Sequence, residues 1–122
     1  MKALSIPLGI VLLASTQSLA KCRFDLVTWH YGFDANQTGE ANSGKECSIT
    51  FNNGKHSDIT SMQIVRQPKH GVASWNGSPY YAKITYKSKS GYTGPDDFVY
   101  GVTGINAHGK GTSNITVTLA VD

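Results

Sequence analysis

The sequence predicts an all-β protein, an antiparallel sandwich of about seven strands. Apolar and polar residues alternate with a period of two in four segments, and this pattern places apolar side chains on one face of a strand. Residues typical of turns separate the segments. No window repeats its apolar residues with the period of a helix. Such a pattern is typical of antiparallel sheets with one face in a core and the other in solvent.

The first twenty residues have the layout of a secretory signal peptide. Lys2 supplies a positive charge, residues 3–14 form an apolar run, and Ser18 and Ala20 are small residues at a cleavage site. The run is too short for a membrane helix, which needs about 20 apolar residues. We expect residues 1–20 to be a cleaved signal peptide. Residues 21–122 would then be a single domain, periplasmic or secreted.

Charge and composition argue against several classes of partner. Removal of Lys2 leaves ten Lys and Arg against eight Asp and Glu, a net charge of +2. A nucleic-acid-binding domain usually has a denser basic patch. The mature part contains no apolar run long enough to span a membrane. We expect a soluble monomer that binds no nucleic acid and does not insert into a membrane.

Two cysteines, Cys22 and Cys47, predict one disulfide, because small exported domains commonly pair an even number of cysteines. Closing this loop stabilises the fold by about 3–4 kcal/mol on the chain-entropy model. Lipidation of Cys22 is the alternative, but it needs a small residue where Lys21 stands. A structural zinc site needs four ligands, more than two cysteines supply. The bridge is expected to join the first strand to the second.

The strands are expected in the following order along the mature chain. The four clearest alternating segments are residues 46–51, 82–87, 98–102 and 115–121. Weaker candidates are residues 22–31, 59–67 and 72–75. About seven strands in about 100 residues are typical of an immunoglobulin-like sandwich.

Turn residues occupy the breaks between these segments. Glycine, proline and asparagine mark turns at residues 52–54, 68–71, 76–77, 90–91 and 94–95. Asn76-Gly77 can supply the two positive φ angles of a tight hairpin. The glycine-rich residues 104–111 and the polar residues 34–44 are predicted as loops, the second of them flexible.

Two stretches of the C-terminal half match the motifs of a known family. Residues 67–72 read Gln-Pro-Lys-His-Gly-Val, and Tyr86 precedes the aromatic, glycine-rich stretch 91–100. They resemble the QPxHGxV and YxPxxGFxGxDxFxY motifs of bacterial Ig-like or cadherin-like repeats, over about residues 59–121. Ser88 stands where that family usually has proline, and this chain carries one copy rather than a tandem array. The resemblance implies an Ig-like sandwich with no enzyme activity and no fixed ligand.

Motifs for catalysis and for metal or phosphate binding are incomplete. No serine lies in a G-x-S-x-G sequence, and the four histidines lack metal-ligand spacing. Asp96 and Asp97 could join a calcium site, but an aspartate that hydrogen-bonds nearby backbone in a turn explains them as well. Residues 104–110 match a phosphate-loop spacing, but Gly111 follows where serine or threonine is needed. We therefore assign no catalytic residue, metal ligand or cofactor.

Aromatic residues beside predicted turns provide the candidate binding surface. Exposed rings near loops can stack on sugars or anchor a protein partner. The candidate residues are Trp75, Tyr80, Tyr81, His108 and Lys110. Trp29 is expected in the core instead.

Lys83 and Lys87 share one face of a predicted strand. The ordinary explanation is a solvated face that protects an edge strand from aggregation, and contact with an anionic surface polymer is the alternative.

The function expected from the sequence is a non-enzymatic binding or structural module. Its partner would be an unknown protein or glycan of the cell envelope or exterior. Carbohydrate binding through the hairpin aromatics is one alternative, and a small enzyme or metal carrier is another.

Overall fold

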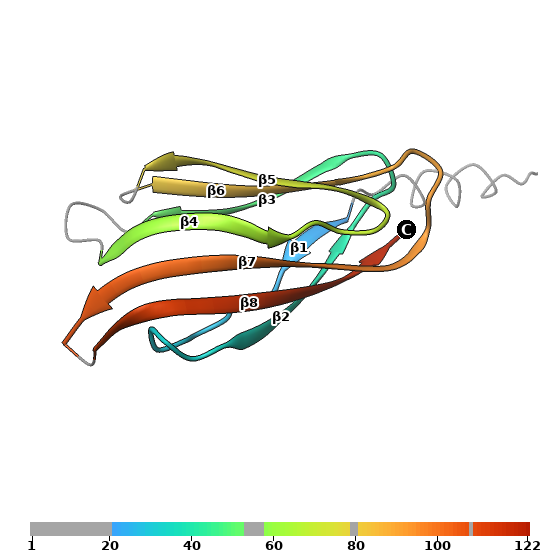
Figure 1. Cartoon of the computed structure of the whole chain (residues 1–122). Helices are drawn as coiled ribbons and strands as arrows, with labels where there is room; N and C mark the ends of the chain where they lie inside the picture. Colours follow the sequence, from blue (N-terminus) through green and yellow to red (C-terminus); the bar gives the residue numbers. More distant parts are fainter. Residues whose placement is uncertain (1–20, 53–57, 79–80, 108) are drawn as a thin grey trace, which may run out of the picture.

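The computed structural model of the protein describes residues 21–52, 58–78, 81–107 and 109–122 (Figure 1). The predicted signal peptide, residues 1–20, lies outside the described residues. These residues form eight strands and no helix. The strands are β1 (Cys22–Phe24), β2 (Ala35–Ala41), β3 (Glu46–Asn52), β4 (Ile59–Arg66), β5 (Gly71–Ser78), β6 (Tyr81–Ser88), β7 (Gly94–Asn106) and β8 (Gly109–Val121). The described part of the chain contains no helix long and apolar enough to cross a membrane.

The strands form two sheets that pack face to face, as the sequence predicts (Figure 1). The larger sheet has the order β1-β2-β8-β7-β4 and the smaller sheet the order β3-β6-β5. All neighbours are antiparallel except β2 and β8, which are parallel. The alternating side chains of the predicted strands fill the core between the sheets. Its largest fully buried members are Ile84, Tyr86, Phe98, Tyr100, Ile115 and Leu119.

The prediction of a flexible loop at residues 34–44 is wrong, because β2 occupies most of it. This strand has few apolar residues and is held by polar contacts instead. Gln37 is 2% exposed, accepts a hydrogen bond from the Tyr100 hydroxyl at 2.9 Å and donates one to the Asp25 carbonyl at 2.7 Å. A core strand whose side chains are polar does not produce the apolar alternation from which strands are predicted.

Three further turn or loop predictions are wrong, because strand pairing runs through the predicted positions. The turn predicted at residues 94–95 lies in β7, which begins at Gly94. Asn76 and Gly77 pair with Lys83 and Ala82, and the ladder continues to the pair Ser78 and Tyr81. Residues 104–106 and 109–111 likewise belong to β7 and β8 rather than to a loop.

The glycine at position 104 marks a close packing contact rather than a flexible loop. A Cβ atom on Gly104 would lie 2.4 Å from the Tyr31 ring and 2.5 Å from the Asp58 carbonyl oxygen. Tyr31 ends the segment predicted as a strand at residues 22–31, of which residues 22–24 alone form a strand. The alternating pattern of this segment still predicts which side chains are buried, since Val27, Trp29 and Tyr31 pack on the core.

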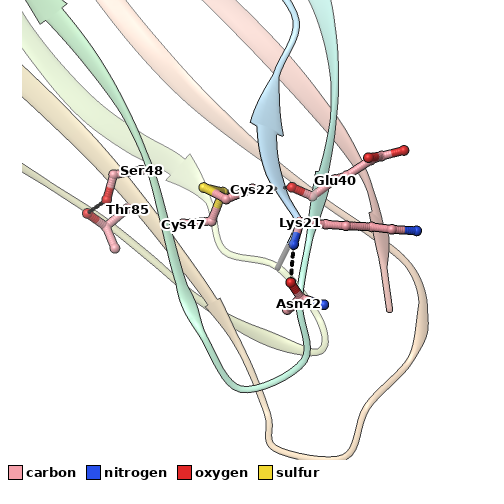
Figure 2. The surroundings of a disulfide bond; sticks show 7 residues. All are labelled: Lys21, Cys22, Glu40, Asn42, Cys47, Ser48 and Thr85. Carbon is pink, nitrogen blue, oxygen red and sulfur yellow. Dashed lines mark hydrogen bonds between the residues drawn. A yellow bond between two sulfur atoms is a disulfide. The ribbon is translucent and has the colours of Figure 1, made fainter. Parts of the chain in front are cut away.

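The predicted disulfide between Cys22 and Cys47 is present and joins the two sheets (Figure 2). Cys22 lies on β1 and Cys47 on β3, which are edge strands of different sheets. Their Cα atoms are 5.4 Å apart. The bridge therefore closes one side of the sandwich, beside the turn that connects β2 to β3.

The connections lie at two opposite ends of the sandwich (Figure 1). The disulfide end contains the turns 42–45, 67–70 and 89–93, together with the C-terminus. The hairpin end contains the last residues of β5 and β7 and the first residues of β6 and β8. The predicted turns at 68–71 and 90–91 are confirmed at the disulfide end.

Candidate functional site

The hairpin end gathers the described members of the predicted binding surface. Trp75 and Tyr81 come from the β5–β6 hairpin, and Lys110 comes from the β7–β8 hairpin, where it pairs with Ile105. Both hairpins end on the same side of the sandwich (Figure 1). Tyr80 and His108 lie outside the described residues. The topology thus brings together residues that the sequence analysis drew from two separate segments.

Four large apolar side chains near this end remain exposed. The exposed fractions are 38% for Trp75, 52% for Tyr81, 54% for Ile105 and 70% for Phe33, whose neighbour Gly32 packs against Gly111. Ile105 is absent from the predicted binding surface, because it falls within the loop predicted at residues 104–111. Ile105 can be recognised as an exposed strand residue only when the pairing of β7 with β8 is known. Exposed apolar groups of this kind often mark a contact surface.

Trp75 points toward the gap between the two sheets. Together with Ser78 and residues 59–62 it lines a cavity of about 90 Å³. This cavity lies between β4 and β5, which are edge strands of different sheets. Trp75 is therefore partly a core residue and only partly available to a partner.

An aromatic cluster supports the hairpin end from within. The Phe51 ring meets Trp29 and Tyr100 edge to face, with ring centroids 6.3 and 6.0 Å apart. Trp29 packs against the core, as predicted. The Tyr31 hydroxyl donates a hydrogen bond to Asp58 at 2.8 Å, and burial, followed by this bond, raises the pKa of Tyr31. The exposed residues therefore stand on a packed base, which lowers the entropic cost of binding.

Asp96 is a buried strand residue rather than the turn aspartate predicted. It is 5% exposed and accepts a hydrogen bond from the Tyr86 hydroxyl at 2.7 Å. As predicted, it also binds nearby backbone, accepting from the amides of Lys69 at 3.2 Å and Asp97 at 3.0 Å. Burial, followed by the bond to Asp96, raises the pKa of Tyr86. Three donors occupy this carboxylate, so its role is to join β6, β7 and the turn 67–70.

The described residues contain no cluster of three or more His, Cys, Asp or Glu side chains that could hold a metal ion. His70 stacks on the Tyr92 ring, with centroids 4.0 Å apart. Within the segment 104–110, which matches a phosphate-loop spacing, residues 104–106 and 109–110 pair along β7 and β8 instead of opening a helix. These positions support packing and pairing rather than catalysis.

A larger groove, which the sequence analysis missed, lies at the disulfide end. It has a volume of about 630 Å³ and is lined by residues 38–39, 93–95 and 118–122. Asp122 is the one ionisable residue in this lining, and its carboxylate forms an ion pair with Lys21 at 2.6 Å. The groove is therefore large enough to hold a ligand, but its lining has no ionisable side chain outside an ion pair.

Comparison with known proteins identifies one family. The family model of the bacterial Ig domain matches residues 33–120, which is more than half of the chain. A search of curated proteins found no match. The matched residues include strands β2 to β7 and most of β8, whereas β1 and Cys22 precede them.

Proposed function

The chain belongs to the bacterial Ig domain family, and on that premise we propose that it is an exported module that binds a protein partner through its hairpin end. Bacterial Ig domains are typically non-catalytic structural or binding modules. The partner would belong to the cell envelope or the exterior. The observation that carries the proposal is the exposure of Trp75, Tyr81 and Ile105 near one end of the sandwich.

Three observations support export to the periplasm or beyond. Residues 1–20 have the charge, apolar run and small residues of a signal peptide. The Cys22–Cys47 disulfide is compatible with an oxidising compartment, where such bonds persist. Bacterial Ig domains are also often extracellular or surface-exposed.

The character of the hairpin end supports a protein partner. Interface cores are enriched in aromatic residues, and a few large side chains usually supply most of the binding energy. Lys110 adds a charged group beside Ile105, as polar rims do around apolar contacts. Most preformed binding surfaces change little in backbone shape on binding, and the described residues of the hairpin end are paired in strands.

Capture of the partner under crosslinking, from the envelope fraction of the native host, tests the proposal. One defined protein should bind the wild type and be lost from Trp75→Ala and Ile105→Ser. Val65→Ser is the matched control, because Val65 is 47% exposed but lies at the far end of β4. Equal loss of the captured protein from all three variants would refute a hairpin-end site.

Carbohydrate binding through the same hairpin is the second candidate. Tyr81 favours it, because half of this side chain is exposed and a sugar ring can stack on an open aromatic face. Trp75 is less suited, since it closes the cavity between β4 and β5. A glycan array probed with wild type and Tyr81→Ala would show retention that depends on Tyr81. Retention that survives the substitution would remove this candidate.

A further inference from the structure

The outward face of the smaller sheet is a largely polar surface, which the hairpin-end proposal uses only through Tyr81. Strand register and alternating burial place its residues in cross-strand rows, with β6 in the middle. The rows are Thr50–Lys83–Asn76, Ser48–Thr85–Ser74 and Glu46–Lys87–Val72. Tyr81 precedes Lys83 by two residues and therefore stands on the same face, at its hairpin-end edge.

Two ammonium groups on this face have no ionic partner among the residues that the structure describes. Lys83 and Lys87 are four residues apart on β6, which separates their Cα atoms by about 13 Å. The ion pairs of the described residues involve Lys21, Arg23 and Arg66 instead. Glu46, opposite Lys87, is the one carboxylate in the three rows. The face therefore has a positive charge that no ion pair neutralises.

Hydroxyl and amide groups fill the space between the two lysines. The hydroxyls of Ser48 and Thr85 form a hydrogen bond of 2.9 Å across β3 and β6 (Figure 2). Ser74 and Asn76 on β5 are exposed beside them. Uncharged donors and acceptors between two cations suit a ligand that carries both hydroxyls and spaced negative charges.

An aromatic ring completes this set of groups. Tyr81 is 52% exposed, so a face of its ring can receive the apolar side of a sugar. A nucleic acid would need a denser array of basic residues than two lysines and a tyrosine. An extended acidic peptide would bind along a strand edge, where backbone groups are free, rather than across a face.

We infer that the outward face of the smaller sheet binds a carboxylated polysaccharide. Its carboxylates contact Lys83 and Lys87, one sugar stacks on Tyr81, and sugar hydroxyls bind the serine, threonine and asparagine side chains between them. Tyr81 belongs to both this site and the hairpin-end surface proposed above, whereas Ile105 and Lys110 lie on the other sheet, so substitutions at Ile105 distinguish the two. The domain would thus hold an acidic envelope or surface polymer with a flat face.

Binding of the full mature chain to three acidic polysaccharides, polygalacturonate, alginate and hyaluronate, tests the inference. At least one should bind, and binding should weaken as salt is added, because exposed charges are screened beyond about 10 Å at 0.1 M salt. Methyl-esterified polygalacturonate has the same sugars without the charge. It should bind far more weakly than polygalacturonate wherever the latter binds.

Charge substitutions locate the site. Lys83→Gln/Lys87→Gln should weaken binding about fivefold, the loss expected for two exposed ion pairs. The control Lys69→Gln/Lys110→Gln removes the same charge elsewhere and should bind as the wild type does. Glu46→Gln removes the one carboxylate of the three rows and should strengthen binding.

Several outcomes would overturn the inference. They are failure of all three polysaccharides to bind, equal binding of the esterified polymer, equal binding of polyglutamate, and equal losses in the two lysine variants. Ile105→Ser should keep polysaccharide binding while it loses the protein partner. The two proposals therefore fail separately.

Discussion

The two ends of this sandwich differ in how their connections are held. At the disulfide end, hydrogen bonds join the turns 42–45, 67–70 and 89–93 to one another, and the disulfide joins β1 to β3 beside them. At the hairpin end, the two described hairpins continue as paired ladders and leave large apolar side chains in solvent. The difference indicates that one end stabilises the fold, and that the other can present side chains without loss of stability.

Ser43 is central to the network at the disulfide end. Its amide donates to the carbonyl of Asp122 at 2.7 Å, and its hydroxyl accepts from the amide of Gly91 at 2.9 Å. Beside it, the amide of Gly44 donates to the hydroxyl of Ser88 at 2.9 Å. Ser88, which replaces the proline usual in the family motif, thereby gains a role in fixing the turn. The amide of Lys89 donates to the carbonyl of His70 at 2.8 Å and joins the other two turns.

Removal of the disulfide should cause the largest loss of stability among the changes at the two ends. Replacement of both cysteines, Cys22→Ala/Cys47→Ala, should lower the free energy of unfolding by about 3.5 kcal/mol, because the bridge closes a loop of about 25 residues. Denaturant unfolding in water measures the change. Reductant should lower the stability of the wild type by a similar amount and leave the double variant unchanged. A loss below about 1 kcal/mol would mean that the hydrogen bonds alone hold this end.

The interior of the hairpin end should also resist change. Gly104→Ala places a methyl group against the Tyr31 ring and the Asp58 carbonyl, so we expect a loss of about 3 kcal/mol from overpacking. Gly109→Ala is the control, because a Cβ atom there meets nothing within 4 Å, although its φ of 139° still strains the backbone. Thermal unfolding of both variants measures the two losses of stability. Equal losses would show that backbone strain, and not packing against Tyr31, explains the glycine.

Removal of the hydroxyl at the buried Tyr86–Asp96 pair should have an intermediate effect. Tyr86→Phe leaves the carboxylate with one donor fewer in a buried place, and we expect a loss of about 1–2 kcal/mol. Tyr81→Phe makes the same chemical change on a half-exposed ring and should leave stability almost unchanged. If the two variants unfold at the same denaturant concentration, the pair does not contribute to the disulfide end.

High pH should reduce the stability of the domain through buried tyrosines at both of its ends. Burial raises the pKa of Tyr31, Tyr86 and Tyr100 above the ordinary value of 10.0. A folded-state pKa above the unfolded value gives a stabilisation that is complete below 10.0 and is lost as the pH rises toward the folded-state pKa. Denaturant midpoints should therefore fall as the pH is raised through this range. Reversible ionisation of every tyrosine near the ordinary pKa in the folded protein would contradict this expectation.

Sequence reasoning succeeded where side chains alternate and failed where backbone geometry decides. Residues 46–51, 82–87 and 98–102 were identified because their apolar side chains form one face of a strand. β2 was missed because its core contact is made by the amide of Gln37, which no hydropathy pattern reveals. The disulfide was predictable from the number of cysteines together with the predicted signal peptide, although Cys22 precedes the residues that match the family.

The candidate site was predictable only in part. Trp75 and Tyr81 are aromatic residues beside turn residues, which marks them as candidates, whereas Ile105 lies within a glycine-rich segment whose sequence predicts a loop. Gly104 and Gly111 make room for residues 31 and 32, which are distant in sequence. Such a close approach depends on tertiary contacts. A single sequence shows that these positions are glycine but does not show which contacts require it.

The smallest expected change in stability belongs to Ile105, and it tests the comparison most directly. This side chain is 54% exposed, so Ile105→Ser removes little buried surface and should change the free energy of unfolding by less than about 0.5 kcal/mol. Val65→Ser, at a similar exposure near the disulfide end, should change it equally little. A loss above about 1 kcal/mol in the Ile105 variant alone would mean that the isoleucine packs in solution and serves the fold. With stability preserved in both variants, any loss of partner binding confined to Ile105→Ser has to come from the surface of the hairpin end itself.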